Sequence, residues 1–330
     1  MLQNTSKNVR IKNTTDAILS PENISCNTKN ENEVNYNMEN EKIQRFGEKK
    51  ILGLNVNNIL SEYYTRCRKK RKALQVGNCA SFLMFKVYDD EEQTRKLERA
   101  SFCKHPLCLM CAWRLSLKRT RELECAVDLL MEENPEGRFY FLTLTVKNWE
   151  IITKEKIKRL QKRGVEFIRK VLGINSYYVS LEITIGQDGL YHPHLHALIY
   201  SPRFLNTTFE FIGMYRKEWA KIVKARGLDY QILTLFSLGY GIESSKNIHE
   251  VTKYILKPKM RISREMVINV SKSIENVKKG FSAGEIREAL KRAKMTISER
   301  DNDELERLSS YDWRIEFYKW VNNNYVLEIE

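Results

Sequence analysis

The sequence lacks the long apolar segments on which membrane insertion and export depend. It contains no run of about 18 or more apolar residues, the length at which a segment spans a bilayer. Its first residues, MLQNTSKNVRIKNTTD, have no hydrophobic signal core. These two absences argue against a membrane-spanning or secreted protein, and we therefore expect a cytoplasmic protein without a membrane partner. Histidine is also scarce, with only 5 in 330 residues.

Positive charge is in clear excess. Lysine and arginine number 56 against 42 acidic residues, which gives a net charge of +14 and a pI near 9.3. A positive potential of this size attracts polyanions whatever fold lies beneath it. We therefore expect nucleic acid as the partner, ahead of an acidic membrane surface.

Composition divides the chain into four regions. Residues 1–45 are rich in Asn, Ser, Thr and Glu and show no helical or strand period, which is typical of a disordered tail. Residues 46–135 are basic, helical in pattern and cysteine-rich, and their basic run from Arg66 to Lys72 is typical of a solvated helix face. Residues 136–260 alternate strands with helices, whereas residues 261–330 are charged, mostly helical in pattern and carry no motif.

The strand pattern within residues 136–260 predicts the sheet. The segment GRFYFLTLTVKN alternates as a strand does, and a basic amphipathic helix ending at Gly173 follows it. Two further strands, YYVSLEITI and YHPHLHALIY, are separated only by the turn GQDG, which predicts an antiparallel hairpin. We therefore expect an α+β fold with a central antiparallel sheet flanked by helices.

The returning strand of this hairpin carries three of the scarce histidines at alternate positions. His194 and His196 project from the same face of a strand and can bind one divalent cation, although neighbouring hydrogen bonds alone would also account for the pair. His192 has the same parity, but Pro193 marks the start of regular pairing and leaves its role open. The residues on the opposite face are apolar and suited to packing on a helix: Leu195, Ala197 and Ile199.

A third ligand is expected from the neighbouring strand. Glu182 lies among hydrophobic residues of that strand, and Thr184 shares its face. Two imidazoles and a carboxylate leave coordination positions for substrate and water, and they accommodate Mg²⁺ or Mn²⁺. The alternative is an ordinary edge or surface glutamate.

A later segment, IHEVTKYILKP, combines groups suited to phosphoryl transfer. Glu250 and Tyr254 are four residues apart and share a helical face, with Lys253 and Lys257 beside the tyrosine. The phenol can attack phosphorus, a lysine can lower its pKa or balance phosphate charge, and the glutamate can act as a base. Packing or surface exposure is the alternative for this spacing.

Cysteine spacing predicts a structural metal centre. The seven cysteines are an odd number in a chain without an export signal, which favours thiols or metal ligands over disulfides. Cys103, Cys108 and Cys111 have the spacing C-x4-C-x2-C, which suits one tetrahedral Zn²⁺. The fourth ligand is left open among Cys79, His105 and Cys67. The basic residues that follow can hold phosphates: Arg114, Lys118, Arg119 and Arg121.

Three segments in this order, FLTLTVKN, HPHLHALIY and EVTKYILK, resemble the motifs of plasmid rolling-circle replication initiators of the Rep_1 type, within the HUH endonuclease superfamily. The segment RASFCKHPLCLMCAWR resembles the N-terminal cysteine segment of the same family, and Cys79 fits its upstream cysteine. The resemblance extends over roughly residues 48–260. It implies a HUH-type nuclease core in residues 136–260, between an N-terminal zinc-knuckle segment and a helical C-terminal region.

The resemblance also implies an activity. Such initiators are metal-dependent endonucleases and strand transferases that nick one strand of a plasmid origin. A tyrosine becomes joined to the 5′ phosphate, and the freed 3′-OH primes synthesis by a host polymerase with a host helicase. The implied roles are nucleophile for Tyr254, support for Lys257, water activation at termination for Glu250 and metal binding for His194 and His196. Thr143, Thr145 and Lys147 of the first motif, and Lys253 of the third, are expected near the DNA.

Two other classes of protein fit parts of the pattern. A single-strand DNA transposase of the HUH type would share the metal and tyrosine chemistry. A zinc-containing DNA-binding regulator without catalysis would keep the basic surface and the cysteines, but it would not need the combination of His194, His196 and Tyr254.

Overall fold

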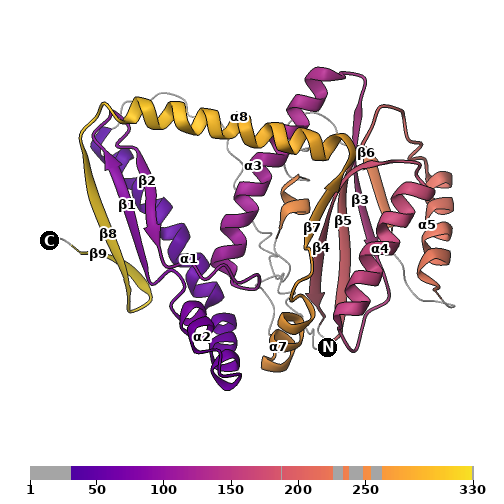
Figure 1. Cartoon of the computed structure of the whole chain (residues 1–330), viewed down its shortest axis with the longest axis horizontal. Coiled ribbons are helices and arrows are strands. Elements are labelled where there is room, and N and C mark those ends of the chain that lie inside the picture. Colours follow the sequence, from indigo (N-terminus) through magenta and orange to yellow (C-terminus); the bar gives the residue numbers. More distant parts are fainter. Residues whose placement is uncertain (1–30, 187, 226–232, 238–247, 254–261, 329–330) are drawn as a thin grey trace, which may run out of the picture. The chain divides into compact units, whose positions relative to one another are not determined.

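The computed structural model describes residues 31–186, 188–225, 233–237, 248–253 and 262–328 (Figure 1). The chain divides into a unit of residues 1–40 and a unit of residues 41–330, and the description below concerns the second unit. No helix in the described ranges is long and apolar enough to cross a bilayer. Helix α1 (Glu31–Arg66) begins inside the segment that was expected to be a disordered tail, and the expectation for residues 1–30 lies outside the described residues.

The larger sheet has five antiparallel strands in the order β6-β3-β5-β4-β7. Their bounds are β3 (Arg138–Thr145), β4 (Ser176–Ile185), β5 (Tyr191–Ser201), β6 (Leu233–Ser237) and β7 (Gly280–Ala283). The predicted hairpin is the β4–β5 pair at the centre of the sheet, and its register places Glu182 opposite His194. The expected α+β class with a central antiparallel sheet is confirmed.

One face of this sheet is apolar and packs against helices α4 (Lys154–Lys170), α5 (Phe209–Val223) and α7 (Arg264–Ser273) (Figure 1). Leu195, Ala197 and Ile199 are buried on it, as their parity predicts. Helix α4 approaches closely because Gly164 has no side chain: a Cβ there would lie 2.5 Å from Cδ1 of Leu195. The back of the histidine strand is therefore held rigidly.

The opposite face is divided between packing and polar residues. At one end, Phe141 and Leu198 pack with α3 (Leu109–Glu133) and α8 (Gly284–Leu308). The helical turn at residues 248–252 joins the same cluster through Ile248 and Val251. At the other end, the register continues this face through the polar residues Thr143, Glu182, His194 and His196.

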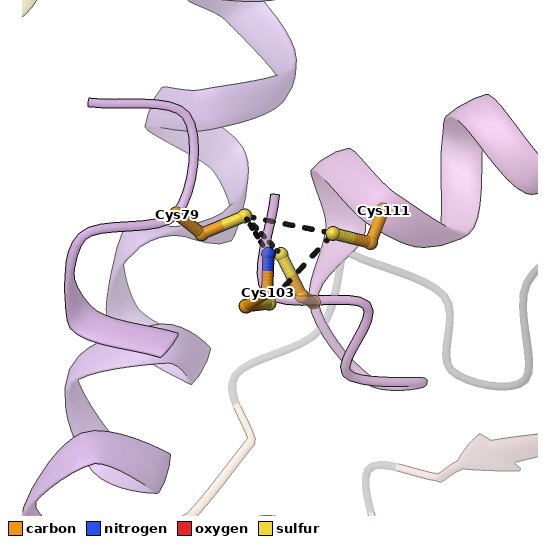
Figure 2. A group of neighbouring side chains, drawn as sticks. Cys79, Cys103 and Cys111 are labelled. Carbon is orange, nitrogen blue, oxygen red and sulfur yellow. Dashed lines mark hydrogen bonds between the residues drawn. The ribbon is translucent and has the colours of Figure 1, made fainter. Parts of the chain in front are cut away.

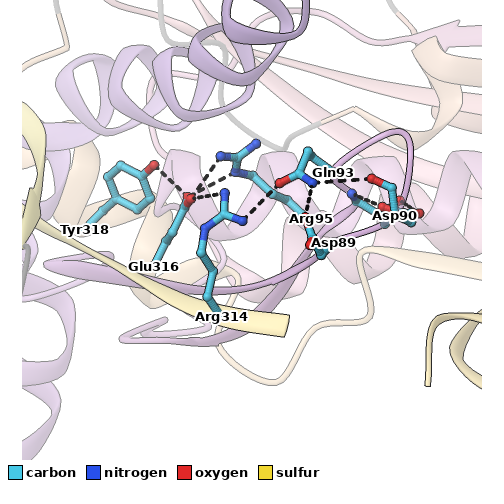
Figure 3. A network of polar contacts seen from close by, with 8 residues as sticks. Asp89, Asp90, Gln93, Arg95, Arg314, Glu316 and Tyr318 are labelled. Carbon is cyan, nitrogen blue, oxygen red and sulfur yellow. Dashed lines mark hydrogen bonds and ion pairs between the residues drawn. The ribbon is translucent and has the colours of Figure 1, made fainter. Parts of the chain in front are cut away.

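The second sheet joins the two ends of the described chain. It has four antiparallel strands, β1 (Phe82–Tyr88), β2 (Arg95–Ala100), β8 (Trp313–Val321) and β9 (Asn324–Glu328), in the order β2-β1-β8-β9. Its inner face packs Leu83 and Phe85 against Phe46 of α1 and against the cysteine loops. Arg95 of β2 and Glu316 of β8 form a two-point ion pair on this face, to which Tyr318 also donates (Figure 3).

Several elements differ from the sequence-based expectation. The region from residue 261 contains α7 and α8 as expected, but it also supplies β7, β8 and β9. On β8, Glu316 is buried and paired with Arg95, and the more exposed Arg314 pairs with the same carboxylate, so the strand does not show an apolar face in its sequence. Strand β2 lies in the region expected to be basic and helical, and it is an edge strand, where exposed charges discourage pairing with another chain.

The basic run from Arg66 to Lys72 is divided between two helices. Helix α1 ends at Arg66, Arg68 adopts the left-handed conformation with φ 58°, and α2 spans Lys70–Gly77. The run therefore turns a corner, and its side chains do not lie along one helix face.

Candidate active site and metal centre

The predicted third ligand contacts one of the predicted histidines directly. Glu182 Oε2 lies 2.9 Å from His196 Nε2, and the other ring nitrogen, Nδ1, lies 3.0 Å from Thr143 Oγ1. Both side chains are mostly covered, with 7% and 13% of the Glu182 and His196 side chains exposed. The imidazole is therefore fixed from both sides by groups on the two neighbouring strands.

His194 lies beside His196 on the same face. The two rings stack with their centroids 6.2 Å apart, and His194 Nε2 is 3.3 Å from Thr184 Oγ1. His192, whose role the sequence left open, turns toward the β4–β5 turn, where its Nε2 is 3.4 Å from Asp188 Oδ1. The structure thus separates the pair His194 and His196 from the third histidine.

Two imidazoles and a carboxylate have the right donor chemistry for Mg²⁺ or Mn²⁺. In the arrangement described, however, His196 Nε2 and Glu182 Oε2 are joined to each other. Within the described ranges, only the four-cysteine group brings three or more ligand atoms within 4.8 Å of one another. The residues therefore fit a divalent cation by type, and binding would have to replace the hydrogen bond between Glu182 and His196.

The turn that precedes the predicted nucleophile packs on the histidine-bearing face of the sheet. Val251 is fully buried in the cluster that α3 and α8 form there, and Thr252 Oγ1 lies 2.6 Å from Thr120 Oγ1 of α3. Glu250 forms an ion pair with Lys253. Tyr254 and Lys257 lie outside the described residues.

The four predicted cysteines meet at one point (Figure 2). Cys79 Sγ lies 3.4 Å from that of Cys108 and 3.5 Å from that of Cys111, which in turn lies 3.7 Å from Cys103 Sγ. Zinc–sulfur bonds of about 2.3 Å in a tetrahedron place sulfur atoms about 3.8 Å apart. The side chains therefore fit a zinc ion with little movement.

Donors around the sulfurs suit thiolates. The backbone amides of Lys104 and His105 donate to Cys111 Sγ and Cys103 Sγ at 3.2 and 3.4 Å, and Asn57 Nδ2 donates to Cys108 Sγ at 3.4 Å. The hydrogen bond from Cys103 lowers the pKa of the Cys108 thiol. Such outer donors orient metal ligands and stabilise their negative charge.

The structure distinguishes among the three candidates for the fourth ligand. Cys79 belongs to the group, whereas Cys67 is exposed and outside it. The His105 ring turns away from the sulfurs, with Nε2 3.0 Å from Tyr64 Oη and Nδ1 accepting from the Leu107 amide. Burial lowers the pKa of His105 to about 4, so the ring is neutral and serves the packing.

Most of the predicted phosphate-binding residues share one cavity. Arg114, Lys118, Arg119 and Lys253 line a space of about 560 Å³ together with Ser180, the β4 residue directly opposite His196. We call this space the α3 cavity. Two predicted residues lie elsewhere: Arg121 pairs with Asp301 of α8 at 2.7 Å, and Lys147 lines a separate basic cavity beside α4.

One further residue of the α3 cavity bears on its charge and was not predicted from the sequence. Lys279, directly before β7, lines the cavity beside Ser180, and its carbonyl accepts from the amide of Leu181 at 2.9 Å. A lysine in a charged, motif-free segment carries no sequence signal. Only the pairing of β7 with β4 brings it to this place.

Comparison with known proteins gives a consistent result. The model of the Rep_1 family, described as "Replication protein", matches residues 94–325, which extends past the sequence motifs to the C-terminal strands. A "Protein rep" of Lentilactobacillus hilgardii is 32% identical over 214 residues, 61% of this chain and 67% of that protein. One of Streptococcus pneumoniae is 30% identical over 235 residues, covering 67% and 70%, and one of Staphylococcus aureus is 28% identical over 246 residues, covering 72% and 99%. No solved structure matches.

Proposed function

This chain belongs to the Rep_1 family of replication proteins, and from that premise we propose that it initiates and terminates rolling-circle replication of a plasmid by nicking one origin strand with Tyr254. One observation carries the proposal. The turn that ends at Lys253 packs, through Ile248 and Val251, on the sheet face that bears Glu182 and His196.

The nicking step follows from these groups. The Tyr254 oxygen forms a bond to the scissile phosphorus, the bond from phosphorus to the 3′ oxygen breaks, and the phenolic proton is lost as the leaving oxygen gains one. The products are a 5′-phosphotyrosine and a 3′-OH that serves as primer. Lys257 balances charge beside the phenolate, and Lys253 contacts a neighbouring phosphate.

Termination needs a different base. Glu250, paired with Lys253 in the structure, accepts a proton from the water that completes the terminating cleavage. A carboxylate suits this second step because it leaves no second covalent link to the protein.

The histidine-bearing face would stabilise the charge that develops on the phosphate during cleavage. His194, His196 and Glu182 would hold a Mg²⁺ or Mn²⁺ ion, whose charge would stabilise the developing charge on the phosphate. Thr143 keeps the His196 ring oriented through Nδ1 at 3.0 Å. The cysteine group would hold a structural Zn²⁺ that fixes the start of α3, the helix from which Arg114, Lys118 and Arg119 reach the α3 cavity.

The proposed partners are plasmid origin DNA and, at the new 3′ end, a host helicase and polymerase. Such an initiator acts in the cytoplasm, where the plasmid is.

The test is a nicking assay on supercoiled plasmid carrying the cognate origin. Tyr254→Phe should give neither nicked circles nor a covalent protein–DNA adduct, while origin binding remains. Tyr311→Phe, a change at an exposed tyrosine in the turn before β8, is the matched control and should behave as the unchanged protein. Efficient nicking by Tyr254→Phe would remove this residue from the mechanism.

A further inference from the structure

A second cavity, larger than the α3 cavity, lies between α2 and the segment from Ser271 to Lys279. It has a volume of about 830 Å³ and is lined by seven lysine and arginine side chains against one carboxylate, Glu275. Five of the seven are the run from Arg68 to Lys72, which turns the corner between α1 and α2. We call it the α2 cavity.

The positive charge of the α2 cavity is not neutralised within the described part of the chain. None of its seven cationic side chains forms an ion pair there, and Lys72 instead lies over the ring of Tyr64, 4.3 Å from its centroid. Clustered cations repel one another, so an arrangement of this kind is stabilised by an anion. Arg68, Lys69, Lys70 and Arg71 are exposed to solvent, as the sequence-based interpretation of this run predicts, and they also line this cavity.

The α2 and α3 cavities are neighbours. Lys104, His105, Pro106 and Lys279 line both of them. The α3 cavity is also lined by Lys253, the residue before the predicted nucleophile, and by Ser180 on the histidine-bearing sheet face. Basic residues therefore line both of the neighbouring cavities, from the corner of α1 and α2 to the candidate active site.

Lys279 occupies the junction and is held there by the backbone. Its carbonyl accepts from the Leu181 amide of β4 at 2.9 Å, and the preceding carbonyl, of Lys278, accepts from Gln161 Nε2 of α4 at 2.6 Å. Burial lowers the pKa of Lys279 to about 8, and the nearby charge of Arg119 acts in the same direction. A half-buried ammonium group without a carboxylate is costly, and a phosphate oxygen would offset that cost.

We propose that the α2 and α3 cavities form one track for the phosphate backbone of a DNA strand, which passes from α2 across Lys279 to the nicking site. The identity of the strand as the nicked one rests on the proposed function. The track itself rests only on the clustered charge that lines the two cavities, the four residues that line both of them and the fixed backbone position of Lys279.

Binding of a strand, measured without cleavage, tests the track. The probe is a fluorescent oligothymidine of about 30 nucleotides, which has a phosphate backbone and no origin sequence. In full-length Tyr254→Phe protein, Lys279→Gln should weaken binding about tenfold at low salt. It should also reduce the slope of log K against log salt by about 0.7, the value for one lost phosphate contact.

Matched control variants, in which lysines outside the two cavities are replaced, distinguish binding along the track from a general effect of the protein's net charge. Lys217→Gln removes an exposed lysine of α5, on the other side of the sheet, and should leave affinity and slope unchanged. Lys69→Gln with Arg71→Gln should reduce the slope by about 1.4, two contacts, whereas Lys217→Gln with Lys221→Gln, two exposed lysines of α5, should not. Wild-type affinity and slope for Lys279→Gln would overturn the track, even if Tyr254 proves to be the nucleophile. Efficient nicking by Tyr254→Phe, or no nicking by the unchanged protein, would instead count against the proposed function while leaving the track in place.

Dependence on pH gives a second readout that a merely structural lysine would not show. The charged groups that line the two cavities together with Lys279 are the run Arg68–Lys72, Lys104, Arg114, Lys118, Arg119, Lys253 and Glu275, with neutral His105 among them. Because free Lys279 loses its proton near pH 8, affinity should fall between pH 7.5 and 9.5. Lys279→Arg, charged throughout, should keep the affinity and abolish the fall. The same fall in Lys279→Arg would show that another group causes it and would contradict the role of Lys279.

Discussion

Glu182 and His196 lie on neighbouring strands and share a hydrogen bond of 2.9 Å between Oε2 and Nε2. The bond connects the two groups that the proposed mechanism needs side by side, an imidazole and a carboxylate. It also means that the carboxylate performs one of two distinguishable tasks. It either orients the ring or binds a cation together with it.

Glu182→Gln separates these tasks. An amide oxygen can still accept from the His196 ring, so the orientation and the fold are kept, but the negative charge that a cation needs is lost. We expect nicking to fall by about a hundredfold, with an unchanged melting temperature. Glu150→Gln, a change at an exposed glutamate, is the control. Full nicking activity in Glu182→Gln would exclude the carboxylate as a ligand.

Removal of the divalent cation by a chelator should also lower nicking. Treatment with EDTA is expected to stop cleavage of the origin, and Mg²⁺ or Mn²⁺ should restore it, because the proposed cation sits at an open oxygen- and nitrogen-ligand site. The measurement is the fraction of nicked circles against the concentration of added metal. Persistent cleavage in metal-free protein would contradict the proposed cation at His194 and His196.

Zinc content tests the cysteine group independently of cleavage. We expect one zinc ion per chain by elemental analysis. Cys108→Ser should lose the ion and several degrees of melting temperature, since this side chain is fully buried at the centre of the group. Cys125→Ser, a change outside the group, should retain both. If the wild-type protein contains no zinc and Cys108→Ser melts at the same temperature as the wild type, the four thiols only pack together.

The buried ion pair of the second sheet predicts a large effect on stability. Arg95→Met leaves the carboxylate of Glu316 buried without its main partner, which should cost about 3–5 kcal/mol of unfolding free energy in denaturant titrations. Only 9% and 10% of the two side chains are exposed. The control is Lys319→Met, which breaks the exposed pair with Glu328 and should cost less than about 1 kcal/mol. Equal effects of the two changes would contradict this difference.

The same pair predicts a dependence of stability on pH. Burial acts to raise the pKa of Glu316, but the hydrogen bonds and charge of Arg95 outweigh it and hold that pKa below its ordinary value. Its contribution is therefore complete above the unfolded value of about 4.3 and is lost as pH falls through the lower folded pKa. Unfolding free energies measured from pH 6 to pH 3 should fall less steeply in Glu316→Gln than in the wild type.

The parts of the fold that follow a local period were predictable. Strands β3, β4 and β5 alternate because one face packs on helices, and the short GQDG turn allows little besides a hairpin, so Glu182 and the histidines could be assigned to one face. The cysteine group could be found because metal coordination restricts ligand spacing.

The remaining features depend on contacts that no local pattern encodes. Strand β8 has charges on its inner face because Arg95, 221 positions away, neutralises Glu316. The α2 cavity needs the corner at Arg68, and the junction of the two cavities needs the pairing of β7 with β4, which places Lys279. In each case a partner distant in the sequence decides the role of the residue.

The pairing of β1 with β8 has a consequence for the order in which the molecule folds during synthesis. The ribosome makes β1, β2 and the cysteine loops early. One edge of β1 nevertheless stays unpaired until β8, more than two hundred residues later in the chain, has been made. Contacts so distant along the chain form slowly, because a long loop must close first. The histidine-bearing hairpin, whose strands are adjacent in sequence, has no such delay. The four-stranded sheet, although β1 and β2 are the first strands to be made, is therefore the sheet that is completed last.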